Sequence, residues 1–446
     1  MESKSGRMVL LDSRAVVVYS SELSKVATLL STLQQENSED ISSITRLEIT
    51  DAQHNSEPYS SESMVKFLTS LRCVVLNLFS LETLVFTHSN LFTLSPHPFD
   101  HVTIDSLTQF TDIICKTSIV NVDLSSTVIL GSTQRQLKGF RYFCTHYLSK
   151  QCKSFVCKDN NLHSLALSCL SQAMATSTSL THLDLSHNCI GRDNYGNESP
   201  SGIIDFCGAL RNCLTISELD VSSNHLTDMN LARLLRVVVT MPQMRTINLA
   251  HNSAGELSCL EVKSLLAHHS QLESPLGIER IDFSCNPLGG FVTAFCGGLA
   301  TCESLQSLDL THCGIPESSS PRLIHCALSN TTLQALNINH NDFSESSAQA
   351  LKAAVNANHH LRSLSRDAHS IRTEFLSDTV CRFYVPYEDN NAFNSSFVHR
   401  KKKAFELNLN HWARASCVLY IQMIRLRRFN SKRRHLRDAL YVAVGI

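Results

Sequence analysis

Carboxylate and imidazole side chains recur along this 446-residue sequence at two fixed positions relative to a short repeated motif, and both groups can do chemistry. The carboxylates stand between two apolar positions of a short repeated motif, at Glu48, Asp123, Asp184, Asp220, Asp282 and Asp309. The imidazoles follow a few residues later, at His88, His187, His251, His312 and His340. Carboxylates attract cationic partners, and an imidazole gains charge below about pH 6.5. A metal row is disfavoured, because these residues come singly from separate motifs and supply no closed ligand set.

The motif that carries these residues is clearest in the stretch SLTHLDLSHNCIG, residues 179–191. Leu180, Leu183, Leu185 and Asn188 stand there in the order L-x-x-L-x-L-x-x-N. Further copies are ISELDVSSNHL (216–226), MRTINLAHNSA (244–254), IERIDFSCNPL (278–288), LQSLDLTHCGI (305–315) and LQALNINHNDF (333–343). Looser copies begin at residue 44 upstream and at Leu361 downstream. Repetition at a period of about 28 residues indicates an array of stacked units rather than separate domains.

Each unit contains the pattern of one strand followed by one helix. The alternating apolar residues of the motif predict a half-buried strand that runs into a polar turn. Between motifs the apolar residues follow a helical period, as at Leu167, Leu170 and Met174. Two longer units contain Gly-, Ser- and Pro-rich insertions at 191–202 and 268–277, which we expect to be loops.

On these residues the chain resembles leucine-rich repeat proteins, nearest their ribonuclease-inhibitor-like class. The resemblance implies a right-handed α/β solenoid, with a parallel sheet on the concave face and helices on the convex face. The turn asparagines, which are expected to satisfy backbone groups where the chain leaves the sheet, are Asn160, Asn188, Asn224, Asn252, Asn286 and Asn341. Cys313 stands at the equivalent position of another repeat.

The repeats divide the chain into four parts. Residues 1–43 are expected to form an N-terminal cap or a degenerate repeat, because the β-like run AVVVY (15–19) precedes a helical stripe. The array of about 10 to 11 repeats covers residues 44–369. Polar residues over 370–398 predict a linker, and a basic, helix-compatible segment occupies 399–446.

Composition excludes several classes of protein. No run of about 18 apolar residues predicts a membrane span, and the first residues lack the apolar core of a secretion signal. The 17 cysteines are scattered without zinc-finger spacing, so we expect reduced thiols and no metal. These features favour a cytoplasmic, cytoskeletal or flagellar location, and no cofactor is predicted.

The sequence contains none of the common catalytic signatures, which include phosphate loops, nucleophile elbows and dinucleotide-binding glycines. We therefore assign no catalytic residue and expect a protein-interaction scaffold whose partner binds the concave Asp- and His-rich face. The competing interpretation is that these acidic residues only fill positions on the sheet. Two other functions stay open, namely a GTPase regulator resembling the Ran-GTPase-activating leucine-rich repeat proteins, and a cytoskeletal or axonemal structural component.

Charge is polarised between the array and the C-terminal segment. Residues 399–446 hold twelve Lys and Arg against two acids, whereas the whole chain has a net charge of −1. The candidate anchors in this segment are Trp412, Arg425, Arg427 and Arg428. Four roles fit them: a helix that caps the array, a segment that docks on the acidic face, a calmodulin-like target helix, and binding to an anionic membrane or nucleic acid.

Overall fold

The computed structural model describes most of the chain up to Tyr384. The described residues are 7–12, 14–19, 23–35, 43–50, 61–87, 102–127, 134–193, 195–269, 277–344, 346–347, 363–365, 372–376 and 380–384. His88 lies outside these ranges, and so does the basic segment 399–446 with Trp412, Arg425, Arg427 and Arg428.

The strands form one sheet in which neighbours in the chain are neighbours in space. β1 (Arg7–Asp12) pairs antiparallel with β2 (Ala15–Tyr19), and from β2 onward each strand runs parallel to the next as far as β13. These strands are β3 (Arg46–Thr50), β4 (Thr83–Thr87), β5 (Asn121–Asp123), β6 (Ser154–Val156), β7 (His182–Asp184), β8 (Glu218–Asp220), β9 (Thr246–Asn248), β10 (Arg280–Asp282), β11 (Ser307–Asp309), β12 (Ala335–Asn337) and β13 (Ser363–Ser365).

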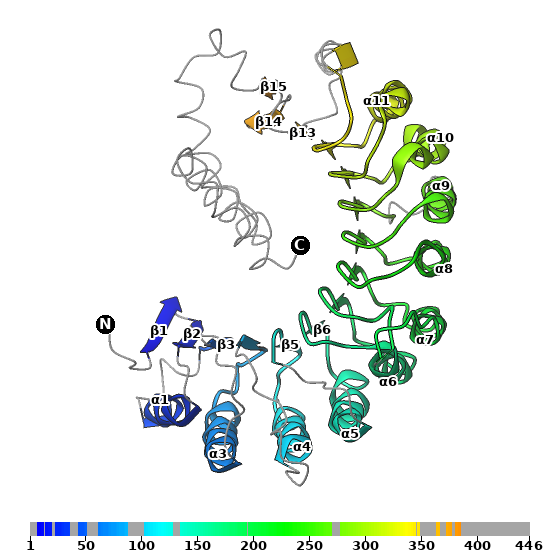
Figure 1. Cartoon of the computed structure of the whole chain (residues 1–446). Helices are drawn as coiled ribbons and strands as arrows, with labels where there is room; N and C mark the ends of the chain where they lie inside the picture. Colours follow the sequence, from blue (N-terminus) through cyan, green and yellow to red (C-terminus); the bar gives the residue numbers. More distant parts are fainter. Residues whose placement is uncertain are drawn as a thin grey trace, which may run out of the picture. The chain divides into compact units, whose positions relative to one another are not determined.

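A helical segment follows each strand from β2 to β11, and these segments cover one side of the sheet (Figure 1). The α-helices are α1 (Leu23–Gln35), α3 (Ser61–Asn77), α4 (Val102–Ile114), α5 (Gln134–Phe143), α6 (Ser164–Met174), α7 (Ser201–Leu210), α8 (Asp228–Val238), α9 (Glu256–His269), α10 (Cys296–Thr301) and α11 (Ser320–Ser329). A π-helical turn, Cys144–Leu148, extends α5, and short 3-10 turns precede α10 and α11 at Gly289–Ala294 and Glu317–Ser319. The predicted solenoid, with its sheet on the concave face and helices on the convex face, is confirmed.

The core lies between the sheet and the helices. The central apolar residues of successive strands pair in register, as Leu183 does with Leu219 and Leu219 with Ile247, and all three are buried. Leu249 follows β9 and is fully buried as well. One repeat alone could not cover these apolar residues, so each unit depends on its neighbours.

Polar side chains join the start of one helix to the next helix in the array. Asp228, in the first turn of α8, accepts hydrogen bonds from the backbone N–H groups of Gly255, Leu257 and Ser258 at 2.8–2.9 Å. These donors lie at the start of α9, where a helix has unpaired N–H groups and favours negative charge. The bonds also lower the pKa of Asp228, although burial opposes that shift.

The end of the described chain differs from the predicted linker. Within 370–398 the structure has two strands, β14 (Arg372–Leu376) and β15 (Val380–Tyr384), which pair antiparallel with each other. β14 also pairs antiparallel with β13. The segments RTEFL and VCRFY are rich in β-branched and aromatic residues, which favour strands and were outweighed in the linker prediction by the polar residues that follow. The boundaries at residues 43 and 399 stay predictions.

Two expectations drawn from composition can be compared with the described residues. None of the described helices is long and apolar enough to cross a bilayer. The described cysteines are free thiols, and most are buried, including Cys144, Cys152, Cys157 and Cys169. They pack as small apolar side chains, as expected.

Candidate functional site on the concave face

One row of side chains on the concave face contains most of the predicted acidic residues. Strand register places Asp184 beside Asp220, Asp220 beside Asn248, and Asn248 beside Asp282. The row continues through Asp309 to Asn337. We call these six residues the Asp/Asn row, in which two aspartates are followed by an asparagine and the pattern then repeats. Glu48 and Asp123 lie in the same register further toward the N-terminus, separated from each other and from the row by Val85 and Val156.

Each aspartate of the row holds the turn that follows its strand. The Oδ1 atoms of Asp184, Asp220, Asp282 and Asp309 accept the backbone N–H two residues further on, at 2.8–2.9 Å. Asn248 and Asn337 accept the equivalent bond with their own Oδ1 atoms, at 3.0 and 3.3 Å. This local bond is typical of Asp and Asn at the start of a turn. It accounts for the residue type at this position without any partner.

The carboxylates are less accessible than the sequence suggested. We expected them to face solvent, but Asp184 is only 6% exposed and Asp220 only 5%. Asp123, Asp282 and Asp309 are half-buried. The correction follows from the turn, because the hydrogen bond to the backbone draws each carboxylate down onto the sheet. The adjacent asparagines cover the outer oxygens, since Asn248 donates to Asp220 Oδ2 and Asn337 to Asp309 Oδ2, both at 2.8 Å.

Burial and like charge make these carboxyl groups easier to protonate. Burial, followed by the charge of Asp184, raises the pKa of Asp220 to about 6. Burial and the charge of Asp282 raise the pKa of Asp309 to about 6 in the same way. Burial also raises the pKa values of Asp123 and Asp282. Asp123, Asp220, Asp282 and Asp309 are therefore weaker acids than exposed carboxylates.

The predicted histidines lie in a second row beside the first. His187, His251, His312 and His340 are all exposed, and each has a positive φ of 53–58°. We call these four residues the histidine row. The N–H groups of His187, His251 and His312 continue the parallel ladder past the strand ends, as in the 2.9 Å bond from His187 to the carbonyl of Ser222. A positive φ is uncommon outside glycine, and His is among the residues that tolerate it. No feature of the motif had predicted this conformation.

Two members of the histidine row, His187 and His251, gain charge at a lower pH than expected. Burial, followed by the charge of Lys158, lowers the pKa of His187, and burial and His312 lower that of His251. The rings of His312 and His340 lie 6.4 Å apart in an edge-on arrangement. Among the described residues no group of three or more His, Cys, Asp or Glu side chains could hold a metal ion.

Sequence reasoning missed a hydrogen-bonded His–Glu pair and an Arg–Glu ion pair at the start of the strands. His182 Nδ1 lies 3.0 Å from Glu218 Oε2, and Arg245 lies 2.7 Å from Glu279. Each pair joins equivalent positions of neighbouring repeats, so alignment of the motifs contained the signal that could have found them. These exposed or half-exposed pairs bound the concave face opposite the histidine row and contribute little stability of their own.

The predicted role of the turn asparagines is confirmed. Asn188 Oδ1 accepts the N–H groups of Asn160 and Leu162 at 2.9 and 3.0 Å, and its Nδ2 donates to the carbonyls of Cys157 and Leu185 at 2.8 and 2.9 Å. Equivalent bonds connect the other repeats into a continuous ladder, which pairs backbone groups that would otherwise be buried without partners. Cys313 keeps a weaker version, in which its thiol donates to the carbonyl of Phe283 at 3.2 Å.

Known proteins resemble parts of this chain. Residues 176–193, 301–315 and 329–352 match the Leucine Rich repeat family model. The chain is 30% identical to the Tonsoku-like protein of Danio rerio over 118 residues, which are 26% of this chain and 8% of that protein. It is 25% identical to the human Centrosomal protein of 78 kDa over 177 residues, which are 39% of this chain and 23% of that protein. The chain therefore spans less than a quarter of the length of either relative.

A solved structure with some likeness is the leucine-rich repeat-containing protein LegL7 from Legionella pneumophila. It is 17% identical, with a TM-score of 0.41, over 70% of this chain and 89% of that chain. The family-model matches coincide with repeats described above, since they contain β7 with Asn188, the turn at Cys313, and β12 with Asn341. These three stretches therefore resemble the leucine-rich repeat family in sequence, and the described array has the strand-and-helix solenoid fold.

Proposed function

We propose that the chain is a non-catalytic interaction scaffold whose concave face binds a protein with a basic surface. The observation that carries the proposal is the alignment of two chemically distinct rows on one open sheet, the Asp/Asn row and the exposed histidine row. Repeat arrays use such extended inner faces for binding. Asp282 and Asp309 retain partial exposure, so a cationic side chain that approaches the row can reach them.

The ribonuclease-inhibitor-like subclass is part of this proposal. Support comes from the regular alternation of strand and helix and from Cys313, which takes the ladder position of an asparagine. We also propose a cytoskeletal location, which is supported by the similarity to a centrosomal protein over 177 residues. No observation on the described residues favours the GTPase-regulating alternative.

The test compares two double variants in affinity capture from cell extract with quantitative mass spectrometry. Asp282→Asn/Asp309→Asn neutralises one aspartate pair and uses the residue that already occupies two places in the row. Asp205→Asn/Glu62→Gln neutralises two exposed acids on helices α7 and α3 and serves as the control. We expect the concave variant to lose its specific partners about tenfold while the control retains them. Equal capture by both variants would contradict binding at this face.

The pH dependence of partner capture is a second test of the same proposal. The pKa values of Asp220 and Asp309 are near 6, so these groups lose their negative charge between pH 7.5 and 5. Capture of a basic partner should weaken over that interval. A partner held equally well at both pH values would not depend on these carboxylates.

A further inference from the structure

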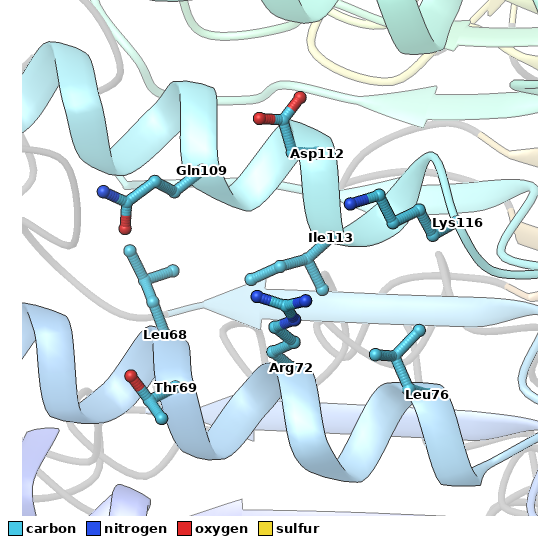
Figure 2. Close-up of a pocket in the computed structure, with 8 residues that line it drawn as sticks. All are labelled: Leu68, Thr69, Arg72, Leu76, Gln109, Asp112, Ile113 and Lys116. Atoms are coloured by element: carbon cyan, nitrogen blue, oxygen red, sulfur yellow. The ribbon is translucent and has the colours of Figure 1, made fainter.

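A groove of about 220 Å³ opens between helices α3 and α4, away from the concave face (Figure 2). Apolar side chains line part of it, namely Leu68 and Leu76 from α3 and Ile113 from α4. Leu68 and Ile113 are buried, whereas Leu76 is half-buried. The groove therefore has an apolar floor that water contacts in the free protein.

Two cationic side chains lie over this floor. Figure 2 shows Arg72 reaching from α3 and Lys116 from the turn after α4 toward the space between the helices. Both residues are exposed, and neither forms an ion pair with any residue that the structure describes. Asp112 also borders the groove, but its Oδ1 accepts the hydroxyl of Tyr142 on α5 at 2.7 Å. The groove therefore presents two cations without an ion-pair partner among the described residues, against one carboxylate whose Oδ1 is bonded to Tyr142.

The apolar surface continues along α3 beyond the groove. Val65 is 56% exposed and lies three residues before Leu68, a spacing that places both on one side of the helix. Phe79, just past the helix end, is 81% exposed, and its carbonyl accepts the hydroxyl of Ser118 at 3.0 Å. This bond joins Phe79 to the turn that carries Lys116. The exposed stripe along α3 thus alternates apolar residues with one arginine.

We propose that this groove and stripe bind an acidic, amphipathic segment of a partner protein. Leu, Phe or Ile side chains of the segment would enter the groove, and its Glu or Asp residues would pair with Arg72 and Lys116. Helix-in-groove and extended recognition both place apolar anchors at regular intervals, as this stripe requires. The fork of an arginine suits a carboxylate in particular. This surface is separate from the concave face, so the inference does not depend on the function proposed above.

The experiment measures fluorescence anisotropy with a designed probe. The probe is a fluorescein-labelled 16-residue peptide with Leu and Phe on one helical face and Glu on the other. A second peptide carries Lys in place of every Glu. The full chain is compared with the groove variant Arg72→Glu/Lys116→Glu and with Lys66→Glu/Lys138→Glu, which changes the net charge equally at exposed lysines outside the groove. Thermal unfolding of each variant checks that the fold is intact.

We expect the acidic peptide to bind the parent chain, to bind the groove variant at least tenfold more weakly, and to bind the control within twofold of the parent. A benzoylphenylalanine at the apolar face of the peptide should cross-link to α3 or α4. Equal losses in both variants, cross-links of the acidic peptide to the concave strands, or equal cross-linking of the lysine peptide to α3 or α4 would overturn the proposal. Sedimentation of the parent alone as a dimer that only the groove variant dissociates would assign the groove to a second copy of this chain and overturn it too. The result expected for the groove does not depend on the Asp/Asn row, so failure here leaves the concave-face proposal standing.

Discussion

The repeats of β2 to β4 and those of β6 to β12 both pack a strand against a helix, but they do so with different side chains. The early repeats have five-residue strands and aromatic side chains in their core. The ring of Phe86 packs edge to face against those of Phe67 and Phe110, with centroid distances of 6.0 and 5.5 Å. The later repeats have three-residue strands, and a ladder of buried asparagine amides joins their turns.

The difference separates two tasks within one repeat array, which are burying a stable core and holding surface side chains in fixed positions. Phe67 on α3 and Phe110 on α4 are buried, and the outer surface of the same two helices carries the groove with Arg72 and Lys116. The amide ladder instead fixes each turn through hydrogen bonds with defined geometry. It therefore fixes the positions of the Asp/Asn and histidine rows that the turns carry. The regular half of the array is suited to presenting side chains in register.

The largest effect should come from a charge in the core of the regular half. Leu249 is fully buried, and Leu249→Asp places a carboxylate there without a partner, which should cost more than about 4 kcal/mol. Because each repeat depends on both neighbours, much of the array should unfold, as circular dichroism on heating would show. Ile49, equally buried within β3, is the matched site in the early repeats, and Ile49→Asp should leave the later repeats folded. Melting temperatures equal to that of the parent would refute the register of the strands.

Removing one ladder amide should have the next largest effect. Asn224→Ala leaves the N–H of Ile190, bonded to Asn224 Oδ1 at 3.3 Å, without a partner, and removes one of the two hydrogen bonds to the carbonyl of Leu185, which keeps its bond from Asn188. Leaving a buried polar group unpaired should cost about 1–3 kcal/mol in the free energy of unfolding. Denaturant titration provides the measurement, and the exposed Asn212→Ala is the control. A loss as small as that of the control would mean that the ladder does not hold the regular half together.

Neutralising one member of each aspartate pair, Asp184/Asp220 and Asp282/Asp309, should raise the free energy of unfolding at neutral pH but not at acidic pH. A carboxyl whose pKa is raised in the folded state contributes stability that is full below its unfolded pKa, near 3.9, and is lost as the pH rises through about 6. Asp184→Asn/Asp282→Asn removes the neighbouring charge and should stabilise the fold by about 1–2 kcal/mol at pH 7.5. The gain should vanish near pH 4.5. A gain of the same size at both pH values would show that repulsion between the aspartates is not its source.

The smallest effect, a shift close to zero, is expected for reduction. The described cysteines are free in both halves, and burial raises the pKa of Cys152 and Cys259 to about 12, so these thiols stay protonated. The melting temperature should be the same with and without strong reductant. A drop of many degrees on reduction would reveal disulfides and a different packing in one half.

The motif predicted the regular half well because its residue types follow from local needs. Alternating leucines define the strand, and Asn188 or Asn224 marks the turn, since few side chains offer donors and acceptors in that space. The depth of Asp184 and Asp220 could not be predicted, because it depends on a bond to the following backbone and on the next repeat. The groove at Arg72 and Lys116 was beyond prediction as well, since the early repeats are degenerate and nothing local fixes the spacing of α3 and α4.

The positive φ angles of the histidine row bear on the thermodynamics of binding. All four histidines of the row have a similar positive φ, and the N–H groups of His187, His251 and His312 donate ladder hydrogen bonds, so the backbone conformational entropy of these turns is already lost when the chain folds. Only the two side-chain torsions of each imidazole are left to order on contact. A partner that meets this row therefore encounters a preorganised surface, and little of the interaction free energy is consumed in arranging it. Substitution by a β-branched residue would strain these turns and remove that advantage even where the new side chain could make the same contact.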